Sequence, residues 1–116
     1  MAEPALDRRQ SLAGIPALNR GVSWRLNDKQ EVTLCVPRQR RAGWLGHFQP
    51  PRWESRYQLD TLGSFVVQQI DGKRTVLEIT GNFAAHFRVN RREAEIATVS
   101  FMKMLLERNI ISIGIR

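Results

Sequence analysis

Residues 70–79, Ile-Asp-Gly-Lys-Arg-Thr-Val-Leu-Glu-Ile, decide the fold because they predict where one helix ends and the next begins. Gly72 suits the left-handed backbone that often follows the last turn of a helix. Thr75 and Glu78 have the spacing of a capping box, in which each side chain accepts a hydrogen bond from the other residue's backbone N–H. The stretch therefore predicts a tight junction between two helices.

Apolar residues recur at helical spacing on both sides of this junction. Before it, Asp60 is placed to cap a helix whose apolar stripe is Leu62, Phe65, Val66 and Ile70. After it, the stripe is Val76, Ile79, Phe83 and Phe87. Gly81 lies inside this second helix at a cost of about 1 kcal/mol relative to alanine, so a close neighbour is expected there.

A third helix is predicted between Asn90, a suitable N-cap, and Asn109, an acceptable stop. Its core stripe is predicted to be Ala94, Ala97, Phe101 and Leu105. A second apolar side consists of Ile96, Val99, Met104 and Leu106. A surface helix needs only one apolar stripe to pack on its own domain. The second apolar side is therefore expected to pack against something else: the terminal isoleucines, the segment Trp44–Trp53, a dimer partner or a peptide.

Alternating residues predict strands upstream. Residues 21–37 are expected to form a hairpin that Pro37 ends, and residues 56–59 a third strand. Residues 110–115 are β-branched and predict a short terminal strand. Residues 1–19 are expected to be a flexible tail, since no period persists there.

The insertion at residues 38–55 is basic and rich in glycine and proline, so it is expected to be an ordered loop rather than a strand or helix. Its large apolar residues are Trp44, Leu45, Phe48 and Trp53. They are expected to dock on the domain or on a second copy, because exposing them to water is unfavourable.

These elements predict an α+β fold in one domain, residues 20–116: a winged helix-turn-helix with a three-stranded antiparallel sheet followed by three helices. The chain carries 18 basic and 11 acidic residues, a formal +7, which favours acidic partners or serves solubility alone. A single cysteine and no apolar run of about 20 residues predict a cytoplasmic protein.

Catalysis is not expected. Cys35, His47 and His86 are scattered along the sequence, so neither a Cys–His nucleophile nor a zinc site is predicted. The glycines match no phosphate-binding loop, and no cofactor is expected.

The residues quoted above between Leu59 and Ile111 resemble the PqqD family, named for a protein of pyrroloquinoline quinone biosynthesis and related to the RiPP recognition elements. The segment Asp71–Ile79 carries most of the likeness. The resemblance implies a non-catalytic domain that captures a precursor or leader peptide by strand addition and presents it to a modifying enzyme, often a radical SAM enzyme.

The same resemblance implies a groove between the third strand and the third helix. The matching positions are Arg56, Tyr57, Gln58, Leu59, Arg92, Glu95, Ile96, Val99, Ser100 and Lys103. The insertion at 38–55 departs from the short loop of the family.

Two other functions compete with this one. A basic winged helix also fits nucleic acid, although Glu93 and Glu95 follow Arg91 and Arg92 and would repel phosphate. Those arginines either meet an acidic ligand or are compensated by the two glutamates. The third function is that of a dimeric assembly subunit of an enzyme complex.

Overall fold

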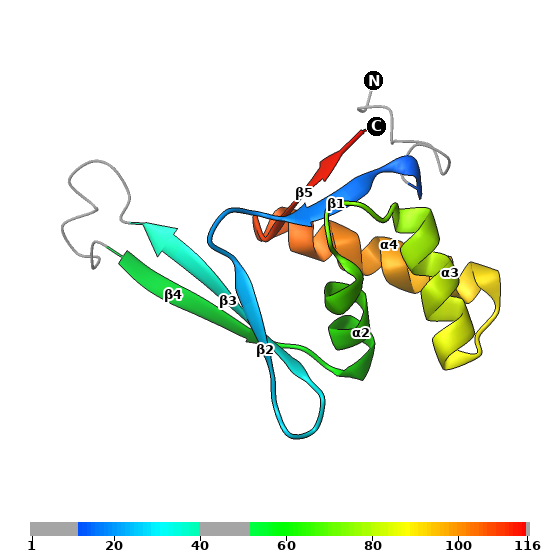
Figure 1. Ribbon diagram of the computed structural model, residues 1–116, viewed down its shortest axis with the longest axis horizontal. Coiled ribbons are helices and arrows are strands. Elements are labelled where there is room, and N and C mark those ends of the chain that lie inside the picture. Colours follow the sequence, from blue (N-terminus) through cyan, green and yellow to red (C-terminus); the bar gives the residue numbers. More distant parts are fainter. Residues whose placement is uncertain (1–11, 40–51, 116) are drawn as a thin grey trace. The chain divides into compact units, whose positions relative to one another are not determined.

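The computed structural model describes residues 12–39 and 52–115, and the contacts within it form two compact units (Figure 1). One unit, residues 20–64, holds a three-stranded sheet and is called the sheet unit. The other combines the residues up to Asn19 with residues 65–116 and is called the helical unit. Each is described by itself.

The sheet unit contains β2 (Ser23–Leu26), β3 (Val32–Gln39) and β4 (Arg52–Gln58), in the antiparallel order β2-β3-β4. The predicted hairpin turn is present. The Asn27 Oδ1 atom accepts hydrogen bonds from the backbone N–H groups of Lys29 at 2.8 Å and Glu31 at 2.9 Å, which is the local bonding that favours asparagine in turns. Val32, Leu34 and Val36 are buried on one face of the sheet.

The prediction that Pro37 ends the second strand is wrong, since β3 continues through it to Gln39. The sequence register that pairs Ser23 with Cys35 puts Gly21 opposite Pro37. Because β2 begins only at Ser23, proline removes no hydrogen bond of the β2–β3 ladder. The two residues lie close together: a Cβ atom on Gly21 would be 2.9 Å from Pro37 Cγ.

The expectation that residues 38–55 form a loop is also wrong at both ends. Arg38 and Gln39 extend β3, and β4 begins at Arg52 rather than at Arg56. The residues that join the two strands, 38–39 and 52–55, include none of the glycines and prolines on which the loop prediction rested. Trp44, Leu45 and Phe48 lie outside the described residues, so the predicted docking of this insertion stays a prediction.

In the helical unit, the helices are α2 (Thr61–Gln69, which begins in the sheet unit), α3 (Val76–Phe87) and α4 (Arg91–Glu107). All three predicted caps are confirmed. Asp60 Oδ1 accepts from Gly63 N at 2.8 Å, and Asn90 Oδ1 accepts from Glu93 N at 2.8 Å. The capping box of Thr75 and Glu78 is complete, and Gly72 has the expected left-handed backbone, with φ of 77°.

The apolar stripes differ from prediction in detail. Val76, Ile79 and Phe83 of α3 are buried, but Leu62 of α2 is 45% exposed. The α4 core is turned from the predicted stripe, because Ala97 and Phe101 are only half-buried. Its buried residues are Ala94, Thr98, Met102 and Leu105. The close neighbour expected for Gly81 is absent, since nothing lies within 4 Å of a Cβ atom placed there.

A two-stranded sheet joins distant parts of the helical unit (Figure 1). Strand β1 (Ile15–Leu18) pairs antiparallel with β5 (Ile111–Gly114), so residues 15–18 are not part of a tail as predicted. Asn19 N donates to Ile110 O at 2.9 Å, and hydrogen-bonded pairs alternate along the ladder. The Pro16 nitrogen therefore faces away from β5, where a missing N–H removes no ladder bond.

The described residues thus confirm an α+β fold with a three-stranded antiparallel sheet followed by three helices. Among these residues, none of the helices has the length and apolar character needed to cross a membrane.

Candidate functional site

The free edge of β4 is the first candidate surface. Within the described chain β4 pairs only with β3, and Leu59 N donates to Val32 O at 2.9 Å. Backbone groups of an antiparallel strand point alternately toward the partner and away from it. The N–H and C=O groups of Glu54, Arg56 and Gln58 therefore face outward, free to pair with an added strand.

The side chains of the four predicted residues on this strand point to two faces, as the pleat requires. Tyr57 is half-buried, and its hydroxyl accepts a hydrogen bond from Arg38 Nη2 at 3.0 Å. Leu59 is 8% exposed. Arg56 and Gln58 are exposed on the other face. These residues share the backbone of the edge region but do not form one side-chain surface.

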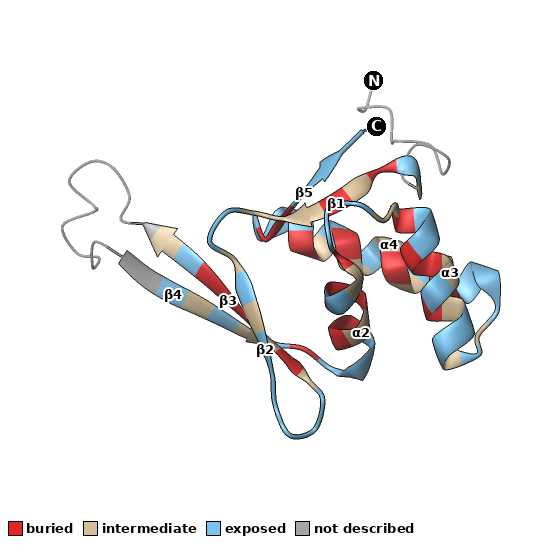
Figure 2. Ribbon diagram, in the orientation of Figure 1, coloured by how far each residue is buried: buried red, intermediate tan, exposed pale blue. Residues whose placement is uncertain are grey.

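The exposed side of α4 is the second candidate surface, and Figure 2 shows buried, intermediate and exposed residues following one another along this helix. The six predicted residues repeat at steps of three and four and are all exposed or half-buried: Arg92, Glu95, Ile96, Val99, Ser100 and Lys103. Ile96, at 60% exposed, is the most accessible large apolar residue of this helix. We call this set the α4 stripe. It lies on the side of α4 away from the buried Ala94 and Leu105.

Charge is mixed at the start of α4. Arg91 and Arg92 are exposed in the first turn, together with Glu93. The Asn90 cap satisfies the Glu93 backbone N–H, and the Glu93 carboxylate complements the helix dipole that the arginines oppose. Glutamate here therefore compensates the arginines locally.

The residues considered for chemistry lie in different surroundings. Cys35 is a buried thiol in β3. His86 is exposed on α3, where its ring stacks on Phe65 with centroids 4.5 Å apart, and His47 lies outside the described residues. In the described ranges no three His, Cys, Asp or Glu side chains gather to hold a metal ion.

One feature of the sheet unit was not predicted from the sequence. Arg25 of β2 and Arg56 of β4 border the same hollow, with Thr33 and Cys35 of β3 between them. Alternation along each strand indicates which residues share a face. Only the pairing register, which sets Cys35 opposite Arg56 and Thr33 opposite Arg25, brings the two arginines to one place.

Comparison with known proteins identifies a family. The sequence model of the family described as Coenzyme PQQ synthesis protein D (PqqD) matches residues 49–111, which include all of β4, all three helices and the first residue of β5. No curated protein and no solved structure matches the chain.

Proposed function

Because this chain belongs to the PqqD family of coenzyme PQQ synthesis proteins, we propose that it is a non-catalytic domain that captures a precursor or leader peptide by strand addition and presents it to a modifying enzyme. The modifying enzyme we propose is a cytoplasmic one, of the radical SAM class. The observation that carries this proposal is the open edge of β4.

Strand addition uses what the β4 edge offers. Three alternate residues, Glu54, Arg56 and Gln58, present outward backbone donors and acceptors. Main-chain hydrogen bonds give affinity in this mode of recognition, and side-chain pockets give selectivity. An extended peptide of about five residues would span these positions at about 3.4 Å per residue.

The α4 stripe is the second surface that we assign to the peptide. Ile96 and Val99 offer apolar contact, while Arg92, Glu95 and Lys103 flank them with both signs of charge. Apolar anchors within a polar rim are typical of protein interfaces. An amphipathic peptide fits this composition better than a purely acidic one.

The experiment starts from peptides selected for binding. A library of random 15-residue peptides is selected on the immobilised full chain, and the enriched peptides are titrated into the 15N-labelled protein. Amide shifts are expected to cluster in residues 52–60 and 91–103. Shifts confined to residues 23–36, or a library without enriched peptides, would contradict the proposal.

A pair of variants at one position isolates the backbone contribution. Gln58→Pro removes an outward N–H, and edge strands tolerate proline, so peptide affinity is expected to fall about tenfold, the equivalent of one well-formed hydrogen bond. Gln58→Ala keeps the N–H and is expected to bind normally. Equal affinity of the two variants would show that the peptide does not pair with this edge.

Nucleic acid is the alternative outcome. The formal charge of +7 predicts weak, salt-sensitive DNA binding without sequence preference. Tight binding to one duplex sequence at physiological salt, lost on changing Arg91 and Arg92, would replace the peptide proposal.

A further inference from the structure

The face of the sheet opposite Val32, Leu34 and Val36 contains an open hollow of about 290 Å³. Its lining residues all belong to the sheet unit and are Arg25, Leu26, Asn27, Thr33, Cys35 and Arg56. Arg56 also belongs to the β4 edge, but the hollow is lined by side chains rather than by the outward backbone groups, and it shares no residue with the α4 stripe.

The hollow follows from side-chain size and strand register. The central strand contributes two small side chains, Thr33 and Cys35, whereas the flanking strands contribute the long side chains of Arg25 and Arg56. Because neighbouring strands lie about 4.8 Å apart, long side chains on both flanks form walls above a small-residue floor. Cys35 is only 7% exposed at that floor.

The charge of the hollow is unbalanced. Both walls carry a guanidinium, and no carboxylate is among the lining residues. Arg56 pairs with Glu54 at 3.2 Å, but their side chains are 69% and 47% exposed, so this pair is weak and easily exchanged. Among the described residues Arg25 has no ion pair at all. The lining residues therefore carry two positive charges, of which only that of Arg56 has a carboxylate partner among the described residues.

The shape and chemistry fit a carboxylate on a short aliphatic stem. Guanidinium groups bind carboxylates with two parallel hydrogen bonds, and the Thr33 hydroxyl supplies a further donor at the floor. Leu26, 42% exposed, adds an apolar wall at one end. A glutamate or aspartate next to an apolar residue satisfies both parts of the lining.

We propose that this hollow is a second binding site, which takes the acidic side chain of an extended peptide segment of a partner protein between Arg25 and Arg56. The site does not depend on strand addition at the β4 edge. The sheet would then bind ligands in two ways: through backbone hydrogen bonds at the β4 edge, and through the charged side chains of the hollow.

The test uses two capped dipeptides that differ only in charge, acetyl-Leu-Glu-amide and acetyl-Leu-Gln-amide, titrated into the 15N-labelled full chain. The glutamate peptide is expected to give saturable amide shifts at residues 25–27, 33–35 and 56. Labelling of Cys35, the single cysteine, by N-ethylmaleimide is expected to slow in its presence. Equal shifts with the glutamine peptide, or shifts spread over all basic residues, would overturn the proposal.

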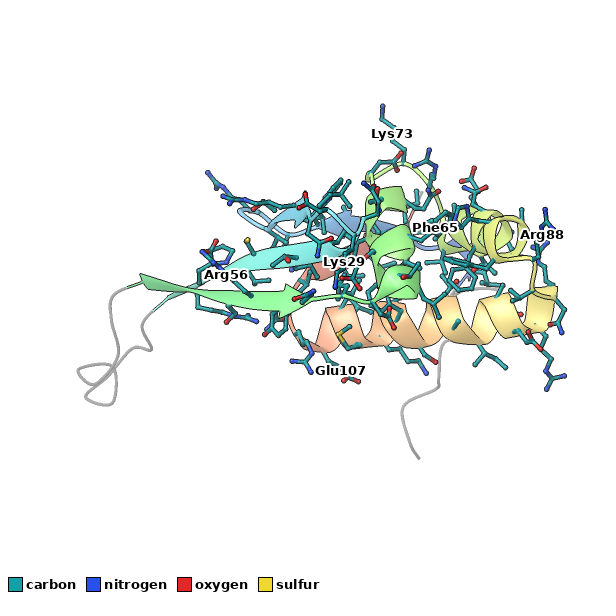
Figure 3. The ribbon with its side chains drawn as sticks, turned by 90° about the horizontal axis from the view of Figure 1, so that it is seen from below. Lys29, Arg56, Phe65, Lys73, Arg88 and Glu107 are labelled. Atoms are coloured by element: carbon teal, nitrogen blue, oxygen red, sulfur yellow. The ribbon has the colours of Figure 1, made fainter. Side chains whose placement is uncertain are left out.

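Variants with equal charge change separate this site from the general basic character of the chain. Arg25→Gln with Arg56→Gln is expected to weaken binding at least tenfold, the typical effect of losing charged hydrogen bonds. Lys73→Gln with Arg88→Gln, two exposed cations of the helical unit, removes the same charge and is expected to change nothing (Figure 3). Similar weakening in both double variants would show non-specific attraction and overturn the site.

Two more measurements fix the identity of the ligand. Gln58→Pro is expected to bind the glutamate dipeptide like the parent chain, so a failure of strand addition and a failure of this site remain distinguishable. Inorganic phosphate at equal ionic strength is expected to compete weakly. Phosphate that binds the same residues more tightly than the dipeptide would overturn the assignment to an acidic peptide.

Discussion

The strands of the sheet unit and the helices of the helical unit differ in how their backbone groups are hydrogen-bonded. They therefore differ in which groups are available to bind a ligand. In the three helices the backbone is satisfied internally and at capped ends, so what these helices can offer a ligand is side chains such as Ile96. In the sheet, β4 leaves every second backbone N–H and C=O group unpaired in the described chain. Its outer face adds the charge of Arg25, which forms no ion pair with the described residues.

Under the proposed function, this difference divides peptide recognition between backbone groups and side chains. Backbone hydrogen bonds at a sheet edge are insensitive to sequence, so they suit the capture of any extended segment. Side-chain surfaces such as the α4 stripe and the Arg25–Arg56 hollow depend on the residues of the ligand. Selectivity is therefore expected from these side chains rather than from the β4 backbone.

The largest expected effect tests whether the helical unit depends on its apolar core. Leu105 is 0% exposed and Leu106, the next residue of α4, is 38% exposed. Leu105→Ala is expected to lower the free energy of unfolding by about 2–5 kcal/mol, since it removes buried methyl groups and leaves a cavity. Leu106→Ala is the matched control and is expected to cost under about 1 kcal/mol. Chemical denaturation measures both, and similar losses would mean that α4 packs in another rotation.

Two glycine-to-alanine substitutions, one in each unit, are expected to change the free energy of unfolding in opposite directions. Gly21 of the sheet unit has φ of 84° and lies against Pro37, so Gly21→Ala is expected to destabilise by about 1–2 kcal/mol or more. Gly81 of the helical unit lies in α3 with open space around it. Gly81→Ala is expected to stabilise by about 0.5–1 kcal/mol. Thermal unfolding of both variants is the measurement, and a loss of stability on Gly81→Ala would reveal a neighbour that the helix requires.

Loss of the capping box at the start of α3 is expected to have a smaller effect on stability. Thr75 Oγ1 accepts from Glu78 N at 3.1 Å, and the Glu78 carboxylate accepts from Thr75 N at 2.9 Å. Thr75→Ala is expected to cost about 1 kcal/mol, whereas Thr75→Ser keeps the accepting hydroxyl and should cost a few tenths. Amide exchange in the first turn of α3 reports the local effect, which should be faster in the alanine variant alone.

The smallest expected effect is a pH dependence in the junction before α3. Backbone N–H groups of Arg74 and Lys73 donate to the Asp71 carboxylate at 2.9 Å each, and they lower the pKa of Asp71. A lowered pKa in the folded state contributes stability above the unfolded value of about 3.9, and this contribution is lost as the pH falls through the folded pKa.

Asp71→Asn keeps an acceptor but does not titrate. The stability difference between the parent chain and this variant is therefore expected to shrink below about pH 4. Unfolding midpoints measured across the acid range provide the check. Parallel pH profiles for the two proteins would contradict the assigned role of this carboxylate.

Local signals predicted the junction and the helix ends because the atoms that make them are close in sequence. Asp60, Thr75 and Asn90 each bond to a backbone N–H three residues later, so a short window contains the whole interaction. The face of α4 was predicted less well. Thr98 and Met102 are buried where Ala97 and Phe101 were expected, since the orientation of a helix depends on what packs against it.

Strand limits depended on distant partners and were missed. Nothing near Pro37 in sequence indicates that β2 does not extend alongside it, and nothing near Arg52 indicates that Gln39 is its partner. Predicting the hollow would likewise have required the strand register that brings Arg25 and Arg56 together. For the candidate site, alternation predicted the third strand and apolar spacing predicted a second apolar side of α4, and the family resemblance assigned residues of both to peptide binding. The outward backbone positions of β4 emerged only from its register.

The β1–β5 ladder has a consequence for the order of folding. Ser112 and Asn19, which hydrogen-bond across it, are 93 residues apart in the chain, so closing this ladder costs far more chain entropy than forming the β2–β3 hairpin or packing α3 on α4. We expect it to close last, and during synthesis β1 leaves the ribosome long before β5 exists. During this interval one edge of β1 lacks a backbone N–H donor at Pro16, which limits the pairing of β1 with a wrong strand.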